Sequence, residues 1–191
     1  MEAAFQRPLK LLQNRLYAHL DVTRPTNLMK YIQCNWTGRG YDMSDERYPA
    51  YLDTIKDQLP SNARDFAEAD WHYDFTNPKC PHDSWVETIT IFEPADGETK
   101  DDRGLEIMVR LLGAFHDGFI ELRYKGVFEY EMSGTSDESW PKIHRPHGDW
   151  LIDEIRLSEN GRVIHEIKFT RARWLIQCED IVYTWKAGKP Y

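Results

Sequence analysis

The sequence predicts an α+β protein that is mainly antiparallel β, arranged as one curved sheet or a sandwich of about seven or eight strands with one or two N-terminal helices. Three observations support this fold class. Apolar and polar residues alternate over much of the second half of the chain, which is the period of a half-buried strand. Two alternating stretches reverse at turn sequences, Asp117-Gly118 and Glu159-Asn160-Gly161. Apolar residues at helical spacing occur in short stretches before residue 70.

The N-terminal residues 1–28 are predicted to form a helical extension, and residues 29–191 a single β-rich domain. Pro8 suits the first turn of a helix over 7–20, where leucines recur every three or four residues. Residues 21–28 have the composition of a linker. The helix could dock elsewhere or pack on the body, and Met29 could be the true start of the chain.

The first part of the β-rich domain is predicted to combine an edge strand with two helices. Residues 29–36 have strand character. A helix over 48–59 has apolar residues on one face and is stopped by Pro60. Ser61 is a candidate cap for a short second helix through Ala69. Further strands are expected at 71–75, where the period becomes two, and at 85–92.

The first hairpin is predicted to run from Leu105 to Met132. A two-residue turn at Asp117-Gly118 would place Leu111 opposite Tyr124 and bring the apolar residues of both strands onto one face.

The second hairpin requires a three-residue loop at 159–161, because a two-residue turn would oppose apolar to charged residues. The predicted pairs are Leu157 with Val163, Ile155 with His165, Asp153 with Ile167 and Leu151 with Phe169. His165 then lies among apolar residues with Asp153 diagonally across, so these two are predicted to form a buried polar pair. The last strand covers 174–185, with a bulge expected at Glu179-Asp180.

Charge and cysteine content limit the classes of function. The net charge is −8, and residues 1–30 hold five basic and two acidic residues, so the remainder carries −11. Such an acidic body disfavours nucleic acid and anionic membranes and would steer the protein towards a basic protein partner. Three cysteines without a CxxC motif favour a reducing compartment, hence the cytoplasm. No apolar run reaches the length of a membrane span.

The best candidate for a metal site is His144, His147 and Asp149, in a predicted loop of about sixteen residues, longer than most plain connections. Two imidazoles and a carboxylate at this spacing could bind one ion. The pattern lacks the helical HExxH spacing and names no fourth ligand. The alternative is a polar loop in which Asp149 starts a strand. A metal-dependent enzyme would use these residues, with His82 and Asp83 as possible additions.

No catalytic residue and no cofactor are predicted. His116-Asp117 belongs to a predicted turn, and Asp83 is interpreted as a cap before Trp85. The sequence contains no nucleophile elbow, phosphate loop or dinucleotide fingerprint.

A candidate partner-binding surface is the outward face of the second hairpin, formed by Trp150, Ile152, Glu154 and Arg156. This prediction requires that no helix covers the row, since a covering helix would make it part of the core.

Several motifs resemble an uncharacterised bacterial protein family over residues 48–185. They are Cys80-Pro81-His82-Asp83-Ser84-Trp85, Gly113-Ala114-Phe115-His116-Asp117-Gly118, His147-Gly148-Asp149-Trp150-Leu151, His165-Glu166-Ile167 and Ile176-Gln177-Cys178-Glu179-Asp180-Ile181. Some members of that family are similar in character to immunity proteins of bacterial toxin systems, and the resemblance implies no catalytic residues. We therefore expect a non-catalytic binding factor of immunity or antitoxin type. The alternatives are the metal-dependent enzyme and a structural module that oligomerises through helix 7–20.

Overall fold

The computed structural model describes residues 29–95, 97–99, 101–134 and 147–190. The chain divides into two compact units, 1–30 and 31–191, and every element below belongs to the second unit. The predicted helix at 7–20 lies outside the described residues. Within the described part, no helix is long and apolar enough to cross a membrane.

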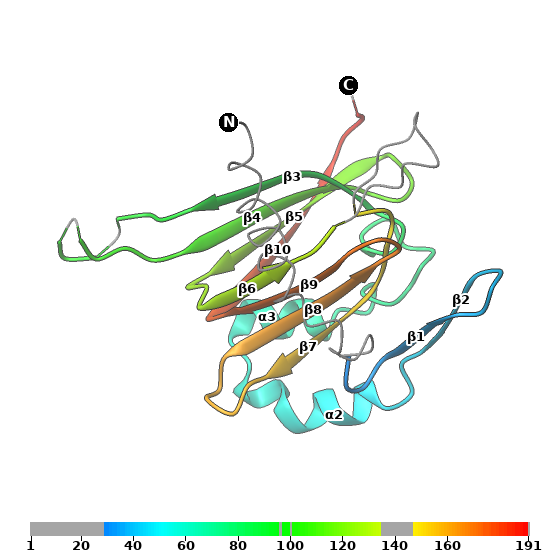
Figure 1. Ribbon diagram of the computed structural model, residues 1–191, viewed down its shortest axis with the longest axis horizontal. Coiled ribbons are helices and arrows are strands. Elements are labelled where there is room, and N and C mark those ends of the chain that lie inside the picture. Colours follow the sequence, from blue (N-terminus) through cyan, green and yellow to red (C-terminus); the bar gives the residue numbers. More distant parts are fainter. Residues whose placement is uncertain (1–28, 96, 100, 135–146, 191) are drawn as a thin grey trace, which may run out of the picture. The chain divides into compact units, whose positions relative to one another are not determined.

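The described residues of this unit form ten strands, two short α-helices and one 3-10 helix (Figure 1). The helical elements are α2 (Tyr48–Ile55), η1 (Lys56–Gln58) and α3 (Ser61–Ala67). The strands are β1 (Gln33–Trp36), β2 (Tyr41–Ser44), β3 (Trp85–Phe92), β4 (Glu106–Leu112), β5 (Gly118–Lys125), β6 (Glu129–Met132), β7 (Trp150–Leu157), β8 (Val163–Phe169), β9 (Arg173–Cys178) and β10 (Asp180–Ala187).

The strands form three antiparallel sheets with the orders β1-β2, β10-β5-β4-β3 and β6-β9-β8-β7. The antiparallel β character is therefore confirmed, whereas the strand count and the single sheet or sandwich are not. The strands are more numerous and the sheets are separate because two long strands are each interrupted. Gly126 has a positive φ of 56° between β5 and β6, and Glu179 separates β9 from β10, where the bulge was expected. The Glu179 N–H donates to the carbonyls of Lys125 (2.9 Å) and Gly126 (3.1 Å), which joins the two larger sheets.

A second seam joins the same two sheets near the start of β3. Trp85 forms an isolated antiparallel bridge with Asp149, just before β7. The Trp150 N–H donates to the Ser84 carbonyl at 3.1 Å, and the Asp83 N–H donates to the Trp150 carbonyl at 2.8 Å. The facing sides of the two sheets hold most of the core, and Phe66 of α3 belongs to the same cluster. The two seams hold together the sheets that contain this core. Because apolar burial is the main driving force of folding, the core contributes most of the stability of the molecule.

The register of the first hairpin differs from the prediction. Leu111 pairs with Ile120, and Ile107 with Tyr124, so the strands are displaced by four residues. The loop is longer than two residues, since the Gly113 N–H donates to the Gly118 carbonyl at 3.0 Å. An even displacement keeps every side chain on its predicted face, which is why the apolar pattern could not detect it.

The second hairpin confirms the three-residue loop. Leu157 pairs with Val163, Ile155 with His165 and Asp153 with Ile167, and Gly161 has the left-handed φ of 75°. The predicted Leu151–Phe169 pair is wrong, because a bulge between Trp150 and Ile152 places Trp150 opposite Phe169 instead. Trp150 thereby joins the core face.

Both predicted helices of the second unit are present, and α2 continues as η1 up to the residue before Leu59-Pro60. The strand predicted at 71–75 is wrong. This stretch forms consecutive tight turns, in which the His72 N–H donates to the Ala69 carbonyl at 2.9 Å and the Asp74 N–H to the Trp71 carbonyl at 3.3 Å. The turns direct His72 into the core, where it is 1% exposed. The strand β2 was not predicted at all.

Candidate functional site

A buried group of titratable side chains surrounds Asp153 on β7. Its Oδ2 lies 2.9 Å from the Nε2 of His72 and 2.9 Å from the Nε2 of His165. Its Oδ1 accepts a hydrogen bond from the Trp150 indole N–H at 3.1 Å. The Nδ1 of His165 lies 2.9 Å from the Tyr124 hydroxyl. The predicted His165–Asp153 pair thus lies in a five-residue network that also links strands β5, β7 and β8.

The hydrogen-bond partners define the protonation of the two rings. The Nδ1 of His72 lies 2.9 Å from the Phe66 carbonyl, which can only accept. The Nε2 of His72 faces the Asp153 carboxylate, so both ring nitrogens of His72 lie against oxygen acceptors. His165 can remain neutral, because its Nδ1 can accept from the Tyr124 hydroxyl.

The charge of Asp153 is stabilised by the same two histidines. Burial raises the pKa of this carboxyl, but His72 and His165 outweigh it and hold the pKa well below its ordinary range. Burial, reinforced by the neighbouring Cys178 and Asp153, raises the pKa of Tyr124 well above its ordinary value. The phenol therefore stays neutral and available as a donor.

This network is sealed from solvent, which rules it out as a catalytic site in this conformation. His72, Asp153 and His165 are each at most 2% exposed. The His72 ring is stacked against Phe66 (centroids 4.2 Å apart) and Tyr73 (4.4 Å). A substrate cannot reach these groups, so their role is to tie strands and turns together through satisfied buried hydrogen bonds.

The structure gives the predicted metal ligands other partners. His144 lies outside the described residues. The His147 ring packs against Trp174 (centroids 5.1 Å apart), and its burial lowers the pKa of the imidazole. The Asp149 Oδ1 accepts a hydrogen bond from the Trp85 indole at 2.7 Å. In the described ranges no group of three His, Cys, Asp or Glu side chains could hold an ion.

The two additional candidates of the metal-dependent reading also have other contacts. The His82 Nδ1 lies 2.7 Å from the Leu151 carbonyl, and the ring is stacked on Phe75 with the centroids 3.9 Å apart. Its Nε2 lies 3.6 Å from the Asp83 carboxylate, which is largely exposed. These contacts fix the loop before β3.

The prediction of a partner-binding surface on the outward face of the second hairpin is wrong. Trp150, Ile152, Glu154 and Arg156 are all buried, so they cannot form an outer surface. Trp150 faces the core because of the bulge in β7. α2 lies against β7, where the Tyr48 hydroxyl donates to the Ile155 carbonyl at 3.0 Å.

The charged residues of this covered row are paired. Oε2 of Glu154 accepts hydrogen bonds from the N–H groups of Tyr31 (3.0 Å) and Ile32 (3.1 Å). Arg156 forms ion pairs with Glu154 and Glu166, and Arg173 also contacts Glu166, at 2.9 Å. The row was predicted to be a surface because alternation alone shows two faces of a strand and not what covers them.

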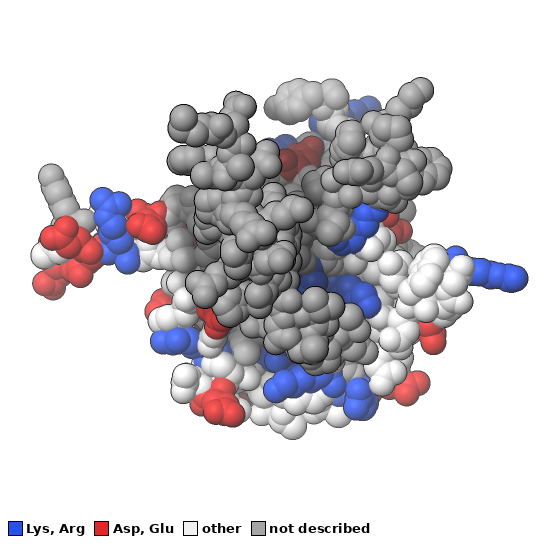
Figure 2. Space-filling model, in the orientation of Figure 1, with Lys and Arg blue, Asp and Glu red and all other residues white. Residues whose placement is uncertain are grey.

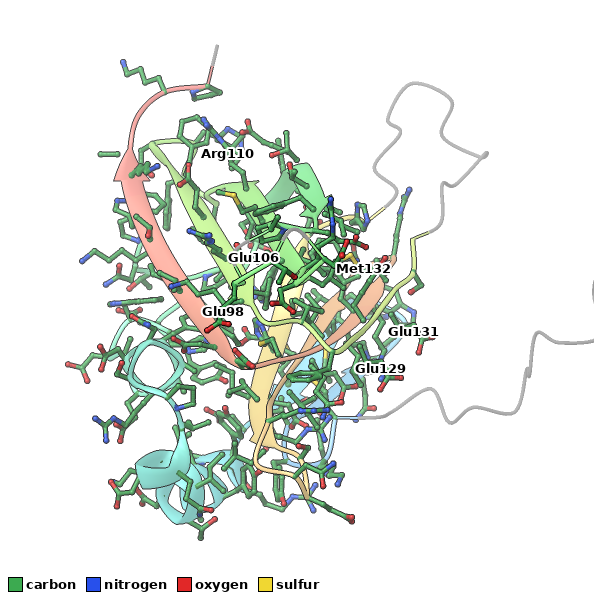
Figure 3. The ribbon with its side chains drawn as sticks, turned by 90° about the vertical axis from the view of Figure 1, so that its left-hand side faces the viewer. Glu98, Glu106, Arg110, Glu129, Glu131 and Met132 are labelled. Atoms are coloured by element: carbon green, nitrogen blue, oxygen red, sulfur yellow. The ribbon has the colours of Figure 1, made fainter. Side chains whose placement is uncertain are left out.

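Exposed aromatic and acidic residues alternate along β6 and the residue before it. Phe128, just before this strand, is 47% exposed and Tyr130 is 41% exposed. Glu129 and Glu131 alternate with them and are also exposed. Figure 3 shows both glutamates on β6. The sequence predicted this stretch as the end of the first hairpin, but its pattern gave no sign that its aromatic residues are exposed.

Elsewhere on the surface the charges are mixed. Figure 2 shows basic and acidic side chains interspersed over one face, with acidic side chains gathered where the β3–β4 hairpin projects. Exposed acids in that hairpin loop are Glu93, Glu98, Asp101 and Asp102. Trp36, at the end of β1, is 62% exposed.

With this geometry in view, comparison with known proteins adds no identification: no protein-family model matches the chain, and no curated protein matches it. The resemblance to immunity-like bacterial proteins therefore stays a prediction.

Proposed function

We propose that this protein is a non-catalytic binding factor that neutralises a basic protein, in the manner of an immunity protein or antitoxin. The observation that carries the proposal is the exposed β6 edge, where Phe128 and Tyr130 alternate with Glu129 and Glu131. Aromatic residues are enriched at protein interfaces, and complementary charge gives such interfaces fast and selective association.

The distribution of the remaining reactive groups is consistent with binding rather than catalysis. The Asp153 network is enclosed, and the cysteines Cys34, Cys80 and Cys178 are all free and buried. The net charge of −8 suits a positively charged target such as a toxin that acts on nucleic acid. Because association of this kind is steered by charge, its rate should fall as the salt concentration rises.

Co-expression tests this function directly. Bacteria that produce the toxic protein encoded beside this gene should grow normally when this protein is co-expressed, and should stop growing when an unrelated acidic protein of similar size replaces it. Purified protein should likewise inhibit the purified toxin. Absence of a toxin gene from the neighbourhood, or failure to restore growth, would overturn the proposal.

A further inference from the structure

We propose that β3 pairs with β3 of a second copy of this chain, antiparallel and about a twofold axis, so that two four-stranded sheets join into one. Beyond Trp85, which bridges to Asp149, β3 pairs with β4 alone among the residues that the structure describes, and it forms one margin of its sheet (Figure 1). An unpaired strand edge is a ready template for another strand. Such a dimer is independent of the proposed binding function.

The backbone groups that β3 directs to its open edge follow from the β3–β4 register. This register continues past the strands, where the Gly104 N–H donates to the Pro94 carbonyl at 3.2 Å. In an antiparallel ladder alternate residues direct both backbone groups to the same neighbour. The even-numbered residues at the end of β3 therefore face β4, and Ile89 and Ile91 direct their N–H and C=O groups to the open edge.

The stretch 88–92 of β3 lacks the features that usually protect an edge strand. Its sequence, Thr-Ile-Thr-Ile-Phe, contains no charged residue, proline or glycine, and β-branched residues favour the extended conformation. Thr88, Thr90 and Ile91 are exposed, and Ile91 is 44% exposed although it is apolar. Natural edge strands are usually kept short or carry charges, proline or a cover. An open and uncharged edge therefore points to pairing with another strand.

The margin at β7 shows how this protein closes a strand edge by its own side chains. The Ile155 N–H donates to the Tyr48 hydroxyl at 2.8 Å, and the same hydroxyl donates to the Ile155 carbonyl at 3.0 Å. In the described part of the chain, no side chain forms such hydrogen bonds with the edge-facing backbone groups of Ile89 and Ile91. The β3 edge is therefore the one at which a strand from outside can supply partners without displacing a cover.

The residues at the two ends of 88–92 select one register for this pairing. At one end the regular ladder is interrupted at Glu87, and at the other end Glu93 and Pro94 follow. Proline has no N–H to donate to a ladder. A twofold axis at Thr90 pairs 88–92 with 92–88 of the second copy and leaves all three of these residues outside. Moving the axis by one residue in either direction would bring a glutamate opposite an isoleucine.

The side chains of the two copies are complementary in this register. Ile89 of each copy exchanges hydrogen bonds with Ile91 of the other, and the two side chains meet on the face that carries Ile107 and Val109. The exposed part of Ile91 is thereby covered, which is favourable for an apolar surface. Thr90 meets Thr90 of the other copy in a non-hydrogen-bonded pair, where opposed side chains approach most closely and threonine pairs stabilise. Because a twofold contact uses each edge once, it gives a closed dimer.

Sedimentation equilibrium of the full-length protein measures this dimer. Because one strand pair is a small interface, we expect the average mass to rise from one chain towards two between about 10 μM and 1 mM protein. Thr90→Lys places two like charges opposite each other at the twofold axis and should weaken dimerisation about tenfold or more. A mass of one chain over the whole concentration range would overturn the inference.

The matched control is Thr184→Lys. Thr184 is exposed on β10, which forms the opposite margin of the same sheet. The substitution and the change in net charge are the same as in Thr90→Lys, so this variant should dimerise as the unmodified protein does. Equal weakening by the two variants would show a dependence on overall charge rather than on the β3 edge, and would also overturn the inference.

Cysteine cross-linking tests the register without introducing a charge. The Cα atoms of a non-hydrogen-bonded pair lie about 4.5 Å apart, which is within reach of a disulfide. Thr90→Cys should therefore give a disulfide-linked dimer with oxidised glutathione, which is reduced as the bond forms. Thr88→Cys is the control, since its two copies would lie about 13 Å apart along the strands and should not link. The native cysteines are buried, so the unmodified protein serves as the blank. Equal cross-linking at both positions would refute the axis at Thr90.

Discussion

At the scale of single residues, His72 shows why a buried site can escape sequence analysis. Its partner Asp153 is separated from it by 81 positions in the chain, and the alternation at 71–75 indicated a strand rather than turns. His165, in contrast, was placed beside Asp153 by a hairpin register that involves twelve positions. The half of the network set by a local turn could be predicted, and the half set by tertiary packing could not.

The hydrogen-bond partners predict different protonation states for the two histidines. His72 should carry a proton on Nδ1, because the Phe66 carbonyl facing it can only accept, whereas His165 should carry its proton on Nε2, which faces the Asp153 carboxylate. Nitrogen–proton correlation spectra of the imidazole rings measure this directly, with His116 in the exposed β4–β5 loop as a reference. An unprotonated Nδ1 on His72 would contradict the arrangement.

Replacement of the central carboxylate tests the energetic role of the network. Asp153→Asn should lower the free energy of unfolding by about 3–5 kcal/mol at neutral pH, since it removes a buried carboxylate that is hydrogen-bonded to His72, His165 and Trp150. Urea denaturation measures the loss, and the exposed Asp101→Asn serves as the control.

The loss of stability in Asp153→Asn should become smaller as the pH falls. The folded-state pKa of Asp153 is depressed, so the stabilisation by its charge is present above the ordinary aspartate pKa and disappears as the pH falls through the lower, folded value. The difference between Asp153→Asn and the unmodified protein should therefore narrow below about pH 4. A difference that grows on acidification would contradict this assignment.

At the scale of elements, periodicity predicted which stretches are strands better than it predicted their partners. The bounds of β3 and the loop of the β7–β8 hairpin agree with expectation, because alternation and a Gly-containing turn determine them locally. The β4–β5 register was wrong by four residues, since Gly118 was assigned to the turn. Gly118 begins β5, where the ring of Trp185 lies against it.

Because of this contact, a side chain at position 118 should destabilise the protein, although Gly118 does not lie in a turn. A Cβ at this position would lie 2.2 Å from the Trp185 ring and 2.8 Å from the Lys186 carbonyl oxygen. Gly118→Ala should therefore cost about 1–3 kcal/mol of stability, measured by denaturant unfolding. Gly40→Ala, in the β1–β2 loop with nothing within 4 Å of its Cβ, should change stability by less than about 0.5 kcal/mol. Similar values for both variants would refute the role of Trp185.

At the scale of the whole molecule, the core that the described residues form lies in the second compact unit. Among these residues, the buried cluster runs from Ile55 to Ile181. A chain shortened to residues 29–191 should keep its β-type circular dichroism and its melting temperature within about 4 °C, since it retains every residue of this cluster. A loss of cooperative melting would show that the first 28 residues are needed for folding. Comparing the masses of the two chains in solution also tests oligomerisation through helix 7–20.

The order in which the three buried thiols react should report which parts of the molecule open first. Burial raises the pKa of Cys80 and of Cys178 to about 12, so neither forms a reactive thiolate while enclosed. Cys34 lies in the two-stranded β1–β2 sheet, and Cys178 at the end of β9 in the core. A thiol reagent should modify Cys34 first and Cys178 only on global unfolding, because small two-stranded sheets open at lower free energy than a core strand. Mass spectrometry at successive reaction times would thus distinguish local opening of the β1–β2 sheet from global unfolding.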